Sequence, residues 1–313
     1  MYYNLEVDVL NNNINNVKKT LDYFENDKKM LLLLELDLSL KQAAFKGYLK
    51  MAELLVNYGA DVNTDNGEPL SVASQEGHFD VVKFLVSKGA NVHAEDNFAF
   101  RKASERGHFE IVNFLYENGA IVQAEDNYAI KKACNREHFE IVKFLIQKGA
   151  DVNAENDFCI RRISNLNNLP IMKLLIDNGA NIHAYNDYIL RYATDNDLYD
   201  ITDYLISIGM DIINNSDPIV NSCRKGNIKI VKLLIKHGAN IHINNELPFV
   251  VATINRRSNV IKYLLKTINY DKETLNYLLI TSSDHGNLKV LKMLLKKNAD
   301  INAKNGSPLQ KAS

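Results

Sequence analysis

The chain has 313 residues, more than one hydrophobic core usually organises, so we expect either two domains or an elongated array of small repeated units. Its 46% hydrophobic and 24% charged residues are ordinary for a folded protein, and a formal net charge of −1 excludes a uniformly polycationic chain. The charge is nevertheless uneven: residues 1–220 hold 21 basic and 33 acidic residues, and residues 221–313 hold 16 and 5. This split indicates a nucleic-acid or membrane contact at the basic end, or simply a polarised surface.

The cysteine content and the apolar runs bear on the compartment. Cys134, Cys159 and Cys223 have no metal-ligand spacing and are too few for a disulfide framework, which suits a reducing, intracellular and cytoplasmic location. The N-terminal residues lack the basic and apolar regions of a secretory signal. The most apolar run, 30–34, is far shorter than the roughly 20 residues that span a bilayer, so we expect no membrane contact.

In chain order, the first element is a degenerate capping repeat over residues 1–35. Ile14, Val17 and Leu21 have the spacing of one helix face, and Leu31–Leu34 are expected to pack within this cap. Terminal repeats of an array are atypical because their outer face meets water.

Residues 36–303 then form about nine tandem units. The spacing of one marker position is 30 residues throughout, except for one interval of 29, and this periodicity predicts an array of stacked units. The marker residues are Gly59, Gly89, Gly119, Gly149, Gly179, Gly209, Gly238, Ile268 and Asn298.

Each unit reads as two helices. In the segment EHFEIVKFLIQKGADVNAEND, from Glu137, apolar residues lie on more than one side of a helix, which predicts a helix packed between neighbours. Gly149 is expected to end it as a left-handed C-cap. Asn156 and Asp157 are expected to cap a shorter helix from about 158 to 165. Small residues should let adjacent helices approach closely, at Ala43, Ala73, Ala103, Ala133, Ala193 and Ala252.

These units resemble the ankyrin repeat. The residues EHFEIVKFLIQKGADVNA correspond to its second helix and following loop, and Glu68-Pro69-Leu70 resembles its first-helix opening. The resemblance implies an all-α, ankyrin-type solenoid of stacked helix-turn-helix repeats. Between Asn153 and Ile160 the unit is three residues shorter than the 33-residue ankyrin pattern, so we expect each β-hairpin loop to be shortened to a tight turn. Short, asparagine-rich units are similar to ankyrin families of giant DNA viruses that infect amoebae.

Residues 304–313 begin a further, incomplete repeat. Leu309 and Ala312 fall at core positions, but the second helix of that unit is missing. We expect weak hydrogen-exchange protection after Ala303.

The histidines do not indicate a metal site. His78, His108 and His138 recur once per unit, roughly 8–10 Å apart by helix packing, whereas ligands of one zinc ion lie about 2 Å from it. We expect each ring to be hydrogen-bonded to the neighbouring loop. The sequence also lacks a phosphate-binding loop and a nucleophile elbow. We therefore expect no catalytic residues, cofactor, metal or small-molecule substrate.

The resemblance to ankyrin arrays also implies partner-binding positions: the turn before each first helix, and the two residues after the small pair of that helix. Each could equally be an unconstrained solvent-facing residue. They are Gln75 and Glu76, Glu105 and Arg106, Asn135 and Arg136, Asn165 and Leu166, Asp195 and Asn196, Arg224 and Lys225.

A second set of repeated positions is aromatic, and we call it the aromatic ladder. It consists of Phe98, Tyr128, Phe158 and Tyr188. Each is followed three residues later by a base, at Arg101, Lys131, Arg161 and Arg191. Two interpretations stay open. The rings cover the repeat junction while the bases pair with nearby acids, or the ladder is an interaction stripe.

The favoured function is a monomeric protein-interaction scaffold that binds another protein on its concave face, as a viral protein engaging host or viral proteins in the host cytoplasm. Alanine at Arg106, Arg136 or Tyr128 should then weaken partner capture without lowering the melting temperature. One alternative is a ubiquitin-ligase substrate adaptor, although no F-box-like segment is evident. Another is nucleic-acid binding through basic residues near the C-terminus, namely Arg224, Lys225, Lys229, Arg256, Arg257, Lys289 and Lys296.

Overall fold

The computed structural model describes residues 5–24 and 29–303, except for the side chains of 24 and 29–34, and these residues contain helices but no β-strand. The predicted half-repeat at 304–313 and the packing of Leu31–Leu34 lie outside the described residues and side chains. The helices are α1 (Leu5–Leu10), α2 (Ile14–Phe24), α3 (Lys29–Lys46), α4 (Leu49–Asn57), α5 (Thr64–Glu76), α6 (Phe79–Ser87), α7 (Ala94–Arg106), α8 (Phe109–Glu117), α9 (Ala124–Asn135), α10 (Phe139–Gln147), α11 (Ala154–Leu166), α12 (Leu169–Asp177), α13 (Ala184–Asp195), α14 (Tyr199–Ser207), α15 (Asp217–Lys225), α16 (Ile228–Lys236), α17 (Ile243–Ile254), α18 (Ser258–Thr267), α19 (Lys272–Asp284) and α20 (Leu288–Leu295).

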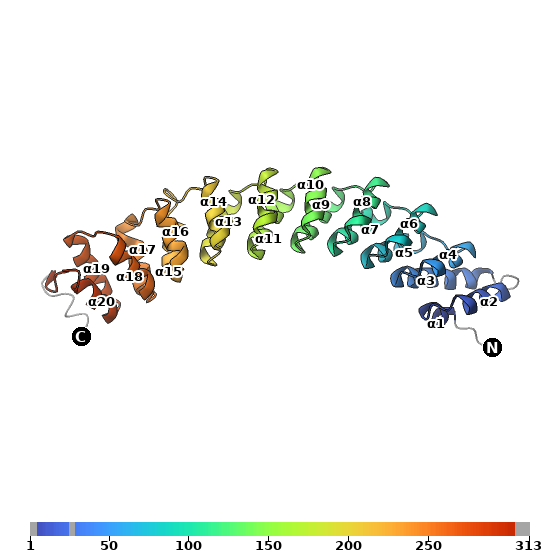
Figure 1. Ribbon diagram of the computed structural model, residues 1–313, viewed down its shortest axis with the longest axis horizontal. Helices are drawn as coiled ribbons and strands as arrows, with labels where there is room; N and C mark the ends of the chain where they lie inside the picture. Colours follow the sequence, from blue (N-terminus) through green and yellow to red (C-terminus); the bar gives the residue numbers. More distant parts are fainter. Residues whose placement is uncertain (1–4, 25–28, 304–313) are drawn as a thin grey trace. The chain divides into compact units, whose positions relative to one another are not determined.

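The helices form two compact units, each built from two layers (Figure 1). In the first unit, residues 1–163 with 170–181, α3, α5, α7 and α9 pack side by side in one layer, and α4, α6, α8 and α10 pack in the other. In the second unit, residues 164–169 with 182–313, the same arrangement holds for α13, α15, α17 and α19 and for α14, α16, α18 and α20. We call these first helices and second helices. The predicted stack of helix pairs is confirmed.

The core lies between the layers, where the repeated apolar positions meet. On α10, Ile141, Val142 and Leu145 are buried, while Lys143 is exposed. The six alanines predicted to allow close helix approach are completely buried. Gly149 ends α10 with φ 88°, the left-handed conformation predicted for it.

The turn that replaces the ankyrin β-hairpin is left-handed. In six connections, three consecutive residues have φ between 45° and 81°, at 65–67, 95–97, 125–127, 155–157, 185–187 and 244–246. This conformation costs most residues about 1–2 kcal/mol and is tolerated best by Gly, Asn and Asp. Those three types fill almost every second and third position of these turns, which explains the asparagine-rich units. The prediction of a tight turn is confirmed.

The third residue of the turn links neighbouring repeats. The side-chain oxygen of Asn97 accepts a hydrogen bond from the backbone N–H of Ile121 at 2.9 Å, and Asn127 accepts one from Asp151 at 2.8 Å. Asp157 is predicted to cap its own helix, but Asn97 and Asn127 at the equivalent third position play a different role. In these two repeats the side chain caps a backbone group of the next unit.

In two other repeats, a residue that precedes the turn makes the hydrogen bonds to the next repeat. Gly67 has no side chain, and in that repeat the Asn63 amide accepts from Asn91 N–H at 2.7 Å and donates to the Gly89 carbonyl at 3.1 Å. The same pair of bonds runs from Asn153 to Asn181 and Gly179, at 2.9 and 3.1 Å. Two of the described connections do without the turn altogether: no residue between Gly209 and Gly226, within the interval of 29 residues, has positive φ, and none does between α18 and α19.

Basic side chains hold the carbonyl groups of the left-handed turn. Arg101 is 7% exposed, and its guanidinium donates to the Glu95 carbonyl at 2.8 Å and the Asp96 carbonyl at 3.0 Å. The same contact recurs from Arg161 to the Asn156 carbonyl and from Arg191 to the Tyr185 carbonyl, each at 3.0 Å. These bonds compensate for carbonyls that the turn withdraws from regular helix pairing.

Tyr185 occupies the first position of such a turn, with φ 52°. Tyrosine is poorly suited to this backbone, and Tyr185→Asn is expected to raise the free energy of unfolding by about 1 kcal/mol because asparagine tolerates left-handed φ. Urea denaturation of the whole chain measures the change. Tyr185→Phe keeps the aromatic ring and should change nothing; an equal gain in both variants would assign the effect to the hydroxyl rather than to the backbone.

The N-terminal helices pack as a further pair. α1 contacts α2 and α3, and α2 contacts α4. Val17 and Leu21, placed on one helix face from their spacing, are both completely buried. The boundaries at 35 and 303 stay predictions.

Candidate partner-binding surface

The predicted contact pairs lie at the C-terminal ends of first helices. In the first unit they end α5, α7 and α9, which pack side by side, so that these three pairs are neighbours. In the second unit, the pair at 165–166 lies at the end of α11, and the other two end α13 and α15, which contact one another.

The two members of each pair have different environments. The second member is exposed in five pairs, at Glu76, Arg106, Arg136, Asn196 and Lys225, and Leu166 is half-buried. The first member is half-buried in four pairs, at Gln75, Glu105, Asn135 and Asp195, and exposed at Asn165 and Arg224.

Several first members are held by internal contacts. The Asn135 amide oxygen accepts a hydrogen bond from Arg162 Nε at 2.5 Å, and that of Asn165 accepts from the Tyr188 hydroxyl at 2.9 Å. Their side chains are therefore engaged within the scaffold. The exposed second members are the better candidates for contact with a partner.

Glu105 has the most internal contacts among the candidates. Its carboxylate accepts a hydrogen bond from Lys102 at 3.2 Å and lies 4.0 Å from Arg136 Nη2. Burial by itself would raise the pKa of the Glu105 carboxyl, but the Lys102 ammonium, together with Lys132 and Arg136, holds that pKa below its ordinary value. Glu105 is thus a charged hub of the junction between α7 and α9.

The periodic histidines bridge the same helix ends. Nε2 of His108 donates to the Gln75 carbonyl at 2.9 Å, and Nε2 of His138 donates to the Glu105 carbonyl at 3.0 Å. His78 makes the equivalent bond to Phe45 at 2.9 Å. The prediction of hydrogen-bonded rings is confirmed. In later repeats Asn227, Arg257 and Asn287 replace histidine and reach the carbonyls of Thr194, Arg224 and Thr253.

The aromatic ladder lies at the repeat junctions. Phe98, Tyr128, Phe158 and Tyr188 are all half-buried. The Arg101 guanidinium lies 5.3 Å from the ring centre of Phe98 and 5.0 Å from that of Tyr128, and pairs with Glu125 at 3.3 Å. Lys131, 9% exposed, pairs with Glu155 at 2.5 Å. These contacts support the interpretation that the bases pair with nearby acids and that the rings cover the repeat junctions.

Tyr128→Ala should consequently lower the melting temperature, contrary to the expectation from sequence.

Comparison with known families agrees with this geometry. Residues 5–96, 94–156 and 219–305 match a family model described as ankyrin repeats (3 copies), and together they cover well over half of the chain. The chain belongs to the ankyrin-repeat family. Ankyrin repeats are typically binding scaffolds rather than catalytic domains.

Two relatives extend the comparison to particular proteins. One ankyrin-repeat protein of Acanthamoeba polyphaga mimivirus is 32% identical over 85 residues, which is 26% of this chain and 14% of that protein. A second from the same virus is 27% identical over 95 residues, 30% of this chain and 33% of its own length. This ankyrin-repeat chain therefore spans at most a third of either relative, and the similarity is to their repeats.

The roles of Arg101 and Glu105 in this ankyrin array are not apparent from the sequence. Its spacing predicts that Arg101 pairs with nearby acidic side chains. The structure shows that its main partners are backbone carbonyls, and residue types alone do not indicate such acceptors. Glu105 falls at a predicted surface position, although Lys102, three residues earlier on the same helix, is a readable sign of an ion pair.

The described residues also bear on metal, thiol and membrane chemistry. Within residues 5–24 and 29–303, no three His, Cys, Asp or Glu side chains are placed to hold a metal ion. All three cysteines of the ankyrin repeats are buried and unpaired, and burial raises the pKa of Cys223 to about 12. None of the helices in this part of the chain is both long enough and apolar enough to cross a membrane.

The basic residues of the nucleic-acid alternative occupy two places in the second unit. Lys225, Arg256 and Arg257 line a cleft of about 290 Å³ at the start of α18. Arg257 also donates to the Arg224 carbonyl at 2.9 Å, so its guanidinium serves the scaffold. The remaining residues, Lys229, Lys289 and Lys296, belong to second helices or follow them directly.

Proposed function

We propose that this ankyrin-repeat protein is an interaction scaffold that binds another protein through the exposed ends of its first helices. The observation that carries the proposal is a contrast between positions. Buried positions repeat the same residue types from unit to unit, whereas the exposed second members are Glu, Arg, Arg, Asn and Lys in turn, at Glu76, Arg106, Arg136, Asn196 and Lys225. Because packing does not determine these exposed residues, they are free to match the surface of a particular partner.

The similarity to two mimivirus proteins supports a finer proposal. We place this chain in a virus of amoebae, where it would engage a host or viral protein in the cytoplasm of the infected cell. A solenoid that presents many adjacent helix ends suits an extended protein surface better than a small molecule.

Alanine substitution at Arg106 and Arg136 tests the proposal, because both side chains are exposed at the ends of neighbouring repeats. A partner is first identified by capture on the immobilised chain from amoebal lysate and then purified. We expect the double variant to bind it about tenfold more weakly or worse, with a melting temperature within about 2 °C of the unaltered chain. Lys143→Ala, an exposed change on second helix α10, is the matched control. Equal binding by all three proteins would refute this surface.

Nucleic-acid binding by the second unit is a second candidate, favoured by the cleft that Lys225 and Arg256 line. A generic DNA duplex should then bind with an affinity that falls steeply as salt is added. Absence of binding at low salt would eliminate this candidate.

A further inference from the structure

The second helices of the C-terminal repeats present a surface of one charge sign. α16, α18 and α20 contain no Asp or Glu. Their equivalents α6, α8, α10 and α14 each carry an acid near the N-terminus. The exposed lysines on or directly after these helices include Lys229, Lys236, Lys262, Lys266, Lys289, Lys292, Lys296 and Lys297.

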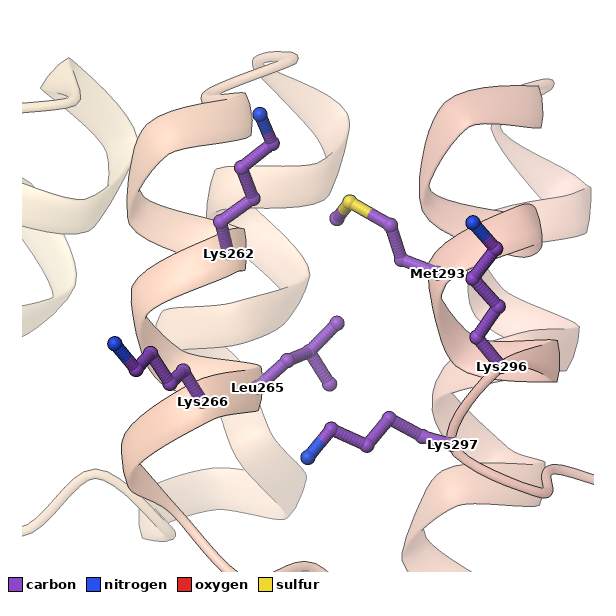
Figure 2. Close-up of a pocket in the computed structure, with 6 residues that line it drawn as sticks. All are labelled: Lys262, Leu265, Lys266, Met293, Lys296 and Lys297. Carbon is purple, nitrogen blue, oxygen red and sulfur yellow. The ribbon is translucent and has the colours of Figure 1, made fainter.

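A groove between α18 and α20 concentrates this charge around an apolar floor. The groove has a volume of about 260 Å³ and is lined by Leu265, Met293 and four lysines, Lys262, Lys266, Lys296 and Lys297. Figure 2 shows Leu265 and Met293 pointing toward one another between the two helices, with Lys297 extending across below them. Leu265 is 4% exposed and Met293 is half-buried, whereas all four lysines are exposed.

In the part of the chain that the structure describes, these four lysines form no ion pair. No carboxylate of the described residues lies within ion-pair distance, 4.0 Å, of any of the four ammonium groups. Like charges that line one groove repel one another, and an anionic occupant would relieve that repulsion. Residues 304–313, which follow α20 in the chain, carry two lysines and no acid, so their charge does not complement the groove.

The combination of a charged rim and an apolar floor restricts the class of occupant. Single-stranded nucleic acids bind through aromatic stacking as well as charge, and none of the lining residues is aromatic. Duplex phosphates would contact lysines but offer no group for the floor. A flat anionic membrane would contact the rim lysines and leave the groove between Leu265 and Met293 empty. A peptide with an apolar side chain between carboxylates matches both parts.

We propose that this groove binds an acidic segment of a partner protein, with one apolar side chain seated between Leu265 and Met293 and flanking Asp or Glu residues paired with the lysines. The inference goes beyond the proposed function because it concerns the second-helix layer, whereas the predicted contact pairs end first helices. Either surface can be used without the other.

Fluorescence anisotropy with labelled synthetic peptides tests the proposal on the full chain at physiological ionic strength. The probe is a short glutamate peptide with one central leucine, and the comparison peptide has serine in place of that leucine. We expect the double variant Lys262→Glu with Lys296→Glu to bind the leucine peptide at least about tenfold more weakly than the unaltered chain does. The serine peptide should bind the unaltered chain about tenfold more weakly than the leucine peptide, since the apolar contact is lost.

Lys143→Glu is the matched control, because Lys143 occupies the position on α10 that Lys262 occupies on α18. It should leave peptide affinity unchanged, and circular dichroism should show the same melting temperature in every variant. Equal affinity for the two peptides, or equal loss in Lys143→Glu, would overturn the proposal. So would tighter, groove-dependent binding of a DNA duplex or of phosphatidylserine vesicles, or self-association that the charge reversal abolishes. Arg106→Ala with Arg136→Ala should not affect these peptides, so failure here is distinct from failure of the proposed function.

Discussion

Replacing Arg101 by alanine is expected to lower the free energy of unfolding by about 3 kcal/mol, since it removes two hydrogen bonds from a charged, buried guanidinium and the packing of a long side chain. The guanidinium holds the carbonyls of Glu95 and Asp96 at 2.8 and 3.0 Å, and it stacks on the rings of Phe98 and Tyr128. Without it, two carbonyls of a left-handed turn lose their partner. Equilibrium urea denaturation measures the loss.

Two comparison variants give this prediction its specificity. Arg106→Ala removes an exposed arginine from the same helix and should change stability by less than about 0.5 kcal/mol. Arg101→Lys should recover only part of the loss, because an ammonium lacks the fork that reaches two carbonyls at once. Lys131, at the equivalent position of the next repeat, pairs instead with the carboxylates of Glu155 and Asp126.

Hydrogen exchange can show which helices lose stability in Arg101→Ala. Repeat arrays unfold in parts, so the amides of α7 and α9 should lose hydrogen-exchange protection in Arg101→Ala while those of α17 keep it. An Arg101→Ala variant as stable as Arg106→Ala would show that the turn does not depend on the guanidinium.

The fold was predictable from sequence where a residue type has one structural meaning. The marker glycines fixed the period, and Gly149 has the left-handed backbone that glycine favours after a helix. Asn97 and Asn127 show the limit. Asparagine before a helix is typical of an N-cap and also tolerates left-handed φ, and only the neighbouring repeat, which supplies the N–H groups of Ile121 and Asp151, decides between the two.

The candidate surface was predictable to the level of position but not of role. Spacing from the small residues located the pairs, including Glu105 with Arg106, on the ends of first helices. It could not show that Glu105 is half-buried while Arg106 is exposed, because that difference depends on side chains of the following repeat such as Arg136. Only the ion pair of Glu105 with Lys102, three residues earlier on the same helix, could have been predicted from spacing. The lysine groove was missed for the same reason: its members come from two repeats and appear in sequence as ordinary solvent-facing lysines.

One such dependence between repeats is visible within the chain itself. A Cβ atom built on Gly107 would lie 2.8 Å from the His138 ring, and those on Gly47, Gly77 and Gly226 would similarly meet the bridging residue of the next repeat. The bridging residues that follow these glycines are large: His78, His108, His138 and Arg257. Where the glycine is replaced by Glu137, Asn167, Asp197 or Arg256, the bridging position holds a side chain with a shorter reach, namely Asn168, Leu198, Asn227 or Asn287. The pairing indicates that the two positions are packed as one.

A double-mutant cycle at Gly107 and His138 tests this coupling. Gly107→Asn should lower the free energy of unfolding by about 2–3 kcal/mol, because the new side chain meets the imidazole, although asparagine tolerates the local φ of 88°. Gly89→Asn is the control. Gly89 has the same φ, and no atom lies within 4 Å of the position that a Cβ would take there, so only the backbone term of under about 1 kcal/mol should remain.

His138→Asn should then restore part of the unfolding free energy that Gly107→Asn removes. His138→Asn shortens the bridging side chain and, like Asn227 with the Thr194 carbonyl at 2.9 Å, still reaches the preceding helix end. In the double variant we expect a coupling free energy of about 1–2 kcal/mol in favour of the pair, measured by urea denaturation. Losses that simply add within about 0.5 kcal/mol would mean that the two residues do not share space. A coupling of this size would show that the left-handed residue after a first helix and the bridging side chain of the following repeat are matched to each other. One of the two could then be exchanged between repeats without loss of stability only if the other is exchanged with it.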